Sequence, residues 1–172
     1  IGRMNDVMRI ESTGVDEDAV WKLLEQALDQ ALDNMLSMRH LEGQKLIGDI
    51  QTKLEQLEKM LEQIAVRAPA VPADYRIRLK QRLQDLLEDQ AGVFFDEQRL
   101  AAEVAAFADK CSLDEELVRL GSHFMQMRQM LDETEPIGKK LDFLIQEINR
   151  EVNTIGSKAN DLQLTRLVVN MK

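Results

Sequence analysis

Polar side chains that can bind metal ions, phosphates or protons gather on one side of the helix predicted for residues 139–155. At the helical step of about 100° per residue, four acid and amide groups fall within about 60° of one another, away from the apolar stripe. These four residues are Asp142, Gln146, Asn149 and Asn153. Asn and Asp are weak helix formers, and a face needed only for solubility would favour Lys, Glu or Gln. The spacing leaves two interpretations open, a functional surface and an ordinary solvated face.

Charged residues of the same helix lie beside this polar face. They are Lys139, Glu147, Arg150, Glu151 and Lys158. Carboxylate and amide oxygens suit Mg²⁺ or Mn²⁺ better than structural zinc, whereas Lys and Arg suit phosphate groups. The segment 137–172 also holds 6 basic and 4 acidic residues, so it is the part of the chain that can attract phosphate.

A second chemical stripe lies in the helix predicted from residue 114 to about residue 132. Glu116, Arg119 and His123 stand at positions i, i+3 and i+7, beside an apolar face that begins with Leu117 and Leu120. A carboxylate, a guanidinium and an imidazole on one stripe can act as an acid–base or phosphate-binding set. The structural alternative is an ion pair within the helix beside a half-exposed histidine. The sequence has no phosphate-binding glycine loop, nucleophile elbow or paired-histidine metalloprotease motif.

Apolar spacing predicts that helices position these stripes. Apolar residues alternate at steps of three and four over 21–38 and again over 47–64, as in helices packed along their length. The two runs are nine residues apart, with Gly43 and Gly48 close to the gap. A bend, a phase shift or a turn between two helices is therefore expected there.

We expect an all-α fold of long antiparallel amphipathic helices followed by a C-terminal helical domain. Residues 1–15 are interpreted as an extended linker or the remnant of an N-terminal domain, and 16–67 as a long helical hairpin or coiled-coil-like arm. Two prolines, at positions 69 and 72, end that arm. Residues 68–172 then form the C-terminal domain, whose first helix is expected to turn Leu79, Leu83 and Leu86 inward.

Composition limits the class of protein. The 172 residues include 31 acidic and 22 basic side chains, a net charge of −9 that argues against a generic polyanion-binding surface. Hydrophobic residues at 44% and charged residues at 31% indicate a folded protein. A single cysteine, Cys111, no membrane-spanning run and no signal-peptide pattern fit a cytoplasmic protein. Because the helical pattern is still running at Lys172, we interpret the chain as part of a longer polypeptide.

Two blocks of sequence resemble the bacterial YicC (YloC) family. One lies within residues 99–123 and includes Arg99-Leu100-Ala101-Ala102-Glu103-Val104 and Ser122-His123; the more specific one runs from Gly138 to Asp161. The similarity extends over residues 16–172. It implies a stress-associated endoribonuclease that needs a divalent cation and assembles as a ring-like hexamer around single-stranded RNA. It also implies that a full-length member is α+β, with most of an N-terminal domain outside this chain.

With this resemblance, the leading hypothesis is a metal-dependent endoribonuclease that hydrolyses single-stranded RNA. The catalytic candidates are His123, Glu147, Glu151 and Glu116; the candidate ligands of Mg²⁺ or Mn²⁺ are Asp142, Glu147 and Glu151; and the RNA-binding candidates are Arg119, Lys139, Arg150, Asn153 and Lys158. A metal-free route through the RNA 2′-hydroxyl stays open, with His123 as the base. The alternatives are a non-catalytic adaptor that promotes small-RNA decay by another ribonuclease, and a structural helical scaffold. Neither DNA nor a membrane is expected as a partner.

Overall fold

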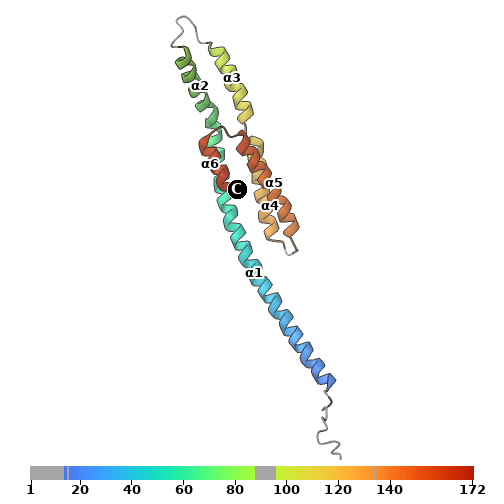
Figure 1. Ribbon diagram of the computed structural model, residues 1–172. Coiled ribbons are helices and arrows are strands. Elements are labelled where there is room, and N and C mark those ends of the chain that lie inside the picture. The colour runs from blue at the N-terminus through green and yellow to red at the C-terminus, as the bar shows by residue number, and fades with distance from the viewer. Residues whose placement is uncertain (1–13, 15, 88–95, 134) are drawn as a thin grey trace, which may run out of the picture. The chain divides into compact units, whose positions relative to one another are not determined.

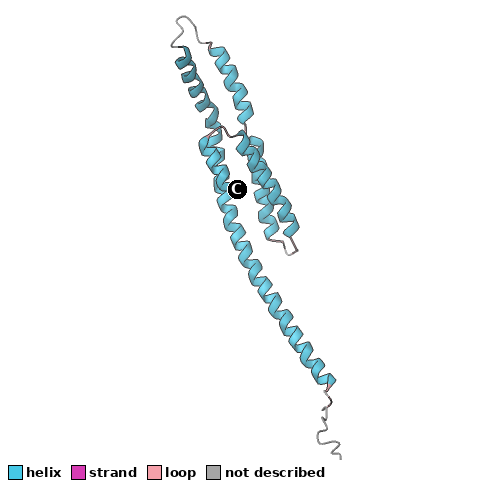
Figure 2. Ribbon diagram, in the orientation of Figure 1, coloured by secondary structure: helices cyan, strands magenta, loops and turns pink. Residues whose placement is uncertain are grey.

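The computed structural model of the protein describes residue 14 and residues 16–87, 96–133 and 135–172. Every regular element in these residues is a helix, so the all-α prediction is confirmed for them (Figure 2). The helices are α1 (Glu17–Arg67), a short 3₁₀ helix (Ala68–Ala70), α2 (Val71–Leu87), α3 (Glu97–Cys111), α4 (Asp114–Leu131), α5 (Gly138–Lys158) and α6 (Leu162–Met171). The linker or domain remnant predicted for residues 1–15 lies outside the described residues, apart from Gly14.

Helix α1 is continuous through Gly43 and Gly48, so the described chain contains no hairpin turn between residues 17 and 67. A glycine inside a helix costs only about 1 kcal/mol relative to alanine, which is too little to end a helix that has apolar runs on both sides. The chain nevertheless divides into two compact units, residues 1–48 and 49–172. The division falls inside α1 because its second apolar run belongs to the core of the second unit.

In the first unit, the apolar run of α1 is exposed to solvent in the single chain. The exposed side chains of this stripe include Trp21, Leu24, Leu28, Met35 and Met38. The sequence correctly indicates a helix here, but the spacing alone does not say what covers its apolar side.

In the second unit, α4 and α5 lie side by side, as do α2 and α3 (Figure 1). One hydrophobic core joins the helices of this unit; its fully buried members include Leu54 and Ile64 of α1, Phe124 of α4, Ile155 of α5 and Leu164 of α6. The second run of α1 is therefore a core element, as its spacing predicts.

Helix boundaries agree with the sequence at most positions. The α1 helix ends at Arg67, immediately before the two prolines, and Asp96 caps α3 by accepting hydrogen bonds from the backbone amides of residues 98 and 99. The N-cap position of α4 is occupied by Leu113, which makes no side-chain capping hydrogen bond. Leu113 is only 2% exposed, so core packing sets the start of α4.

Two apolar side chains of amphipathic helices face solvent, and for one of them, Leu86, the sequence predicts burial. Leu86 of α2 is 67% exposed, although Leu79 and Leu83 are partly buried. On α5, Ile145 is exposed and Leu144 is buried in its place. Each helix packs through a face set by its neighbours, and spacing alone fixes that face only to within one position. No helix in the described residues is both long and apolar enough to cross a membrane.

Candidate functional site

The two stripes predicted to carry chemistry meet where α4 and α5 pack together. The buried side chains of Leu120 and Phe124 on α4, and of Ile148 and Val152 on α5, fix how each helix is rotated about its axis. The polar positions next to these residues are thereby held at the edge of the interface. This packing brings side chains more than 30 residues apart in sequence into contact.

Lys158 joins the end of α5 to the start of α4. Its Nζ donates a hydrogen bond of 2.7 Å to Oε1 of Glu116 and one of 3.2 Å to the backbone carbonyl of Ser112. Glu116 is only 5% exposed, and a carboxylate buried to this degree needs a cationic partner. The lysine supplies both the charge and the hydrogen bond. The sequence gives no signal for the Ser112 carbonyl, because a backbone acceptor leaves no trace in residue types.

Arg119 makes the second link between the helices. Its Nη1 lies 3.7 Å from Oε1 of Glu151, which is also only 5% exposed, and its Nη2 donates to the exposed carboxylate of Glu115. Since Arg119 itself is about half exposed, its guanidinium reaches from a buried carboxylate to solvent. It can therefore present positive charge to a ligand at the surface.

The two ion pairs define an antiparallel register between α4 and α5. Position 116 pairs with 158 and position 119 with 151, and the same register places His123 opposite Glu147. The Nδ1 atom of His123 and the Oε2 atom of Glu116 are buried without a hydrogen-bond partner in the described structure. Buried polar atoms are nearly always paired, so these two atoms keep hydrogen-bonding capacity that a ligand could use.

The surroundings of Glu116 keep its carboxylate ionised. Burial alone would raise the pKa of Glu116, but the hydrogen bond from Lys158, the local backbone amide and the charges of Lys158 and Arg119 together lower that pKa below its ordinary value. At neutral pH this part of the surface thus holds fixed carboxylates and fixed cations side by side. We call the six residues Glu116, Arg119, His123, Glu147, Glu151 and Lys158 the α4–α5 cluster.

The other predicted site residues lie elsewhere on α5. Arg150 and Asn153, together with the neighbouring amides Gln146 and Asn149, line a shallow groove of about 610 Å³. Asn153 is two residues from Glu151, or about 200° around the helix axis. Lys139 and Asp142 are exposed in the first turns of α5. The structure therefore divides the predicted polar surface into two separate faces.

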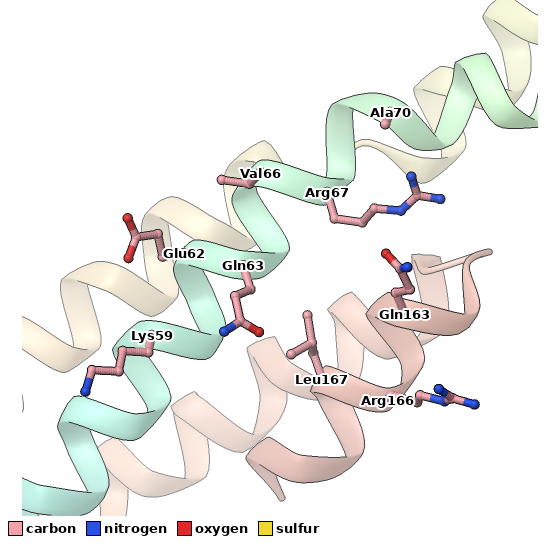
Figure 3. Close-up of a pocket in the computed structure, with 9 residues that line it drawn as sticks. All are labelled: Lys59, Glu62, Gln63, Val66, Arg67, Ala70, Gln163, Arg166 and Leu167. Carbon is pink, nitrogen blue, oxygen red and sulfur yellow. The ribbon is translucent and has the colours of Figure 1, made fainter.

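A larger pocket, of about 850 Å³, lies between the end of α1 and α6 (Figure 3). Arg67 and Gln163 approach each other at its edge, and Arg166 lies on the α6 side. None of the predicted site residues lines this pocket. The guanidinium of Arg67 is already bound by two carboxylates, those of Asp74 at 2.5 Å and Asp161 at 2.6 Å. We therefore place the candidate site at the α4–α5 cluster.

Comparison with known proteins identifies the family of the chain. Residues 64–172 match the model of the family described as endoribonuclease YicC-like, C-terminal, and residues 1–48 match the corresponding N-terminal region. The chain belongs to the endoribonuclease YicC-like family. The C-terminal family region contains the whole α4–α5 cluster. The N-terminal match also extends family similarity to residues 1–15, which the sequence motifs do not reach.

Two curated members of the family align with the whole or nearly the whole chain. A protein of Clostridioides difficile named "Probable endoribonuclease YicC" is 44% identical over 172 residues, which is 100% of this chain. A protein of Haemophilus influenzae with the same name is 34% identical over 173 residues, covering 98% of this chain. The chain spans 58% of the length of each of these relatives.

The metal that the family resemblance implies finds no complete set of ligands in the described residues. Within them, no group of three or more His, Cys, Asp or Glu side chains is placed to hold a metal ion. Asp142 is nine residues from Glu151, about half a turn away around α5, so these two do not share a site. Glu147 and Glu151, four residues apart, lie on one side of the helix. A two-carboxylate arrangement of this kind suits Mg²⁺, which usually binds one or two carboxylates plus water and substrate phosphate.

Proposed function

We propose that this chain carries the cleavage site of an endoribonuclease that hydrolyses single-stranded RNA, and that the α4–α5 cluster is that site. Family membership and the names of both relatives support the reaction class. The observation that supports the location is the partnerless, buried Nδ1 of His123 in the same stripe as Arg119. A proton-transfer group beside a fixed cation is the combination that phosphodiester cleavage requires.

The proposed roles follow from the contacts. Arg119 and Lys158 bind the phosphate and offset the charge that develops on it, because both are cations that reach the surface. Glu151 and Glu116 position these two cations through the buried ion pairs. His123 transfers a proton, and Glu147, opposite it in the register, orients the imidazole or accepts the proton. Two of the four catalytic candidates, Glu116 and Glu151, are thereby assigned as positioning residues.

Dependence on Mg²⁺ or Mn²⁺ forms a separate part of the proposal. Glu147 and Glu151 would hold the cation together with RNA phosphate oxygens. When bound, a divalent cation supplies polarisation of the phosphate and a lower pKa for a bound water. A role in stress-related RNA turnover and assembly into a homo-oligomer such as a hexamer are likewise proposed from the family resemblance. The exposed apolar stripe of α1 supports self-association.

Cleavage of end-labelled single-stranded RNA by the intact protein tests the proposal. Wild type should produce internal cuts, and Glu147→Gln and His123→Ala should each lower the rate by at least about 100-fold, the usual contribution of general acid–base catalysis. Asp132→Asn is the matched control, because Asp132 is an exposed carboxylate at the far end of α4. Parallel reactions with Mn²⁺, Mg²⁺ or EDTA test the metal.

Three results would contradict the proposal or parts of it. Wild-type cleavage rates in the Glu147→Gln and His123→Ala variants would show that the α4–α5 cluster is not the cleavage site. Equal cleavage rates with EDTA and with a divalent cation would show that the reaction does not require a metal. Intact RNA under every condition, together with measurable RNA binding, would instead support the adaptor hypothesis.

A further inference from the structure

Two neighbouring grooves form a basic surface beside the α4–α5 cluster. The first, of about 290 Å³, is lined by Tyr75, Arg78 and Arg82 of α2, and the second, of about 450 Å³, by Lys110 of α3 and by Lys158. Asn160, in the connection between α5 and α6, lines both grooves and therefore joins them. We call the joined surface the α2–α3 groove.

The α2–α3 groove is strongly positive for a protein whose net charge is −9. Four cations line it, and no carboxylate does so among the described residues. Arg78, Arg82 and Lys110 form no ion pair within the described part of the chain, so their charges are available to a ligand. The cations are spread over two joined grooves, two on α2 and two in the adjoining groove, and such a distribution suits a chain of phosphates better than a single anion.

The lining of the α2–α3 groove is partly aromatic. Tyr75 of α2 stacks on Phe107 of α3, with ring centroids 3.7 Å apart and an interplanar angle of 9°. On α2, Tyr75, Arg78 and Arg82 occupy positions i, i+3 and i+7, so the stacked ring and the two arginines share one side of the helix. An aromatic lining between cations is a common feature of surfaces that bind single-stranded nucleic acid.

Lys158 connects the α2–α3 groove to the candidate site. It lines the second groove and also donates to Glu116 of the α4–α5 cluster. A strand lying along Arg82, Arg78 and Lys110 would consequently arrive at Lys158, at the edge of the α4–α5 cluster.

We infer that the α2–α3 groove binds the backbone of single-stranded RNA and guides it to the α4–α5 cluster, an inference that rests on the proposed function. Arg78, Arg82 and Lys110 contact successive phosphates, and Lys158 is the point at which the strand enters the cluster. The RNA-binding surface thus includes α2, which lies far in sequence from the predicted RNA-binding residues Arg150 and Asn153.

Paired double variants of α2 in the intact protein test this inference. Arg78→Ala/Arg82→Ala removes two groove cations, while Arg76→Ala/Lys80→Ala removes the same charge from positions of the same helix that do not line either groove. Binding is measured by fluorescence anisotropy with a labelled 2′-O-methyl single-stranded RNA, whose integrity is checked on a gel. Cleavage of unmodified RNA is measured separately, and circular dichroism confirms that each variant is folded.

The groove variant should bind RNA more weakly than the control variant and with a smaller salt dependence. Losing two phosphate contacts should reduce the slope of log K against log[salt] by about 1.4, so that the advantage of wild type falls about sevenfold between 50 and 200 mM salt. The control variant should retain a steeper slope, close to that of wild type. Equal affinities and slopes in the two double variants would overturn the inference.

The remaining outcomes separate the groove from the cleavage proposal. If wild type binds RNA through Arg78 and Arg82 but leaves unmodified RNA intact, RNA binding by the groove is supported and the proposed cleavage is wrong. If wild type cuts RNA and the groove variant cuts it with an unchanged kcat/KM, the proposed cleavage is supported and RNA binding by the groove is wrong. Poly-glutamate that binds as tightly as RNA, and loses affinity in the same variant, would assign the groove to acidic polypeptides and overturn the inference.

Discussion

At the scale of single residues, Lys158 makes contacts in both the α4–α5 cluster and the α2–α3 groove. Its ammonium group binds a buried carboxylate of α4 and the carbonyl of Ser112, and the same side chain lines the α2–α3 groove. Glu116 receives no other side-chain hydrogen bond in the described structure, since its Oε2 is partnerless. The stability of the cluster and its proposed affinity for phosphate therefore depend on the same lysine.

Replacing Lys158 with methionine should destabilise the protein at neutral pH. The variant keeps most of the side-chain volume but leaves the Glu116 carboxylate buried without a cation, at a cost of about 1–3 kcal/mol. In wild type the pKa of Glu116 is lowered, so its contribution to stability is present above the ordinary carboxyl pKa and disappears as the pH falls through the folded-state value. The deficit of the variant should accordingly shrink as the pH falls from 7 toward about 4, where the unpaired carboxylate takes up a proton.

Urea denaturation at pH 7 and pH 4 measures this difference. Lys139→Met is the control, because Lys139 is an exposed lysine of the same helix with no ion pair in the described residues. Adding Glu116→Gln to the Lys158→Met variant should restore much of the lost stability at pH 7. A deficit that is the same at both pH values would show that lost packing, not charge, is responsible.

The sequence predicts the residues of the candidate site but not their contacts. It identifies the stripe Glu116, Arg119 and His123, and names Glu147, Glu151 and Lys158 on the other helix. It does not show that these residues meet, because the contacts depend on the antiparallel register of two helices more than 30 residues apart. It also groups Asn153 with them, since polarity alone does not distinguish the face next to a partner helix from the face exposed to solvent.

At the scale of helices, the N-terminus of α6 is fixed by Asp161. Its Oδ1 accepts hydrogen bonds from the backbone amides of Gln163 and Leu164, at 2.9 and 3.0 Å, while its Oδ2 accepts one from Arg67 at 2.6 Å. One carboxylate thus caps α6 and ties it to the end of α1. The hydrogen bond from Arg67 is the main cause of the lowered pKa of Asp161, assisted by the two backbone amides against the effect of burial.

Two substitutions of Asp161 should separate the stability that comes from capping α6 from the stability that comes from the ion pair with Arg67. Asp161→Ala should cost about 1–2 kcal/mol through loss of the cap alone, with a further loss from the unpaired Arg67. Asp161→Asn keeps a capping oxygen and should cost less. Because the pKa of Asp161 is lowered by folding, wild-type stability from this group is present above its ordinary pKa and is lost as the pH falls through the folded-state value.

Thermal unfolding of both variants between pH 3 and pH 7 provides the measurement. Asp85→Ala is a suitable control, because Asp85 is an exposed aspartate of α2 with no ion pair in the described residues. Equal losses in the Ala and Asn variants would mean that the ion pair with Arg67 matters and the cap does not. A loss independent of pH in Asp161→Ala would contradict the role of charge.

The sequence predicts helix identity and most helix ends, while helix faces depend on packing. The Asp96 cap and the prolines after Arg67 act locally, so their effects can be predicted from a few neighbouring residues. The outward position of Leu86 and the absence of a turn near Gly43 depend on other helices and on helix continuity, which local patterns do not contain. The basic side of α2 is not apparent from composition, because acidic residues outnumber basic ones in the chain as a whole.

At the scale of the whole molecule, net acidity and the proposed RNA binding are compatible because the charge is unevenly placed. The net charge is −9, yet the α2–α3 groove presents four cations without a carboxylate among the described residues. Acidic surroundings would reduce non-specific attraction to nucleic acid, so the proposed binding would be confined to the groove. Total charge therefore describes the average surface and does not argue against the proposed ligand.

The exposed apolar stripe of α1 is the other feature that acts beyond one chain. It repeats at steps of three and four over residues 21–38, the spacing of a helix that packs against another helix. Leu24 and Leu28 are 57% and 58% exposed in the single chain. Contiguous apolar surface of this kind usually marks an interaction site. We expect a second copy of the chain to cover it, because a heptad stripe is complementary to itself.

Replacing Leu24 and Leu28 with glutamine should therefore weaken self-association. Leucine burial contributes about 1.5–3 kcal/mol per side chain, so the double variant should raise the dissociation constant by at least about 100-fold, measured by sedimentation velocity over a range of concentrations. Leu23→Gln/Leu41→Gln is the matched control, because these exposed leucines share one angular position on α1, about 100° away from the stripe. Circular dichroism should show equal helix content in both variants. A wild-type protein that is monomeric at every concentration, or equal dissociation constants in the two variants, would mean that this stripe does not mediate self-association.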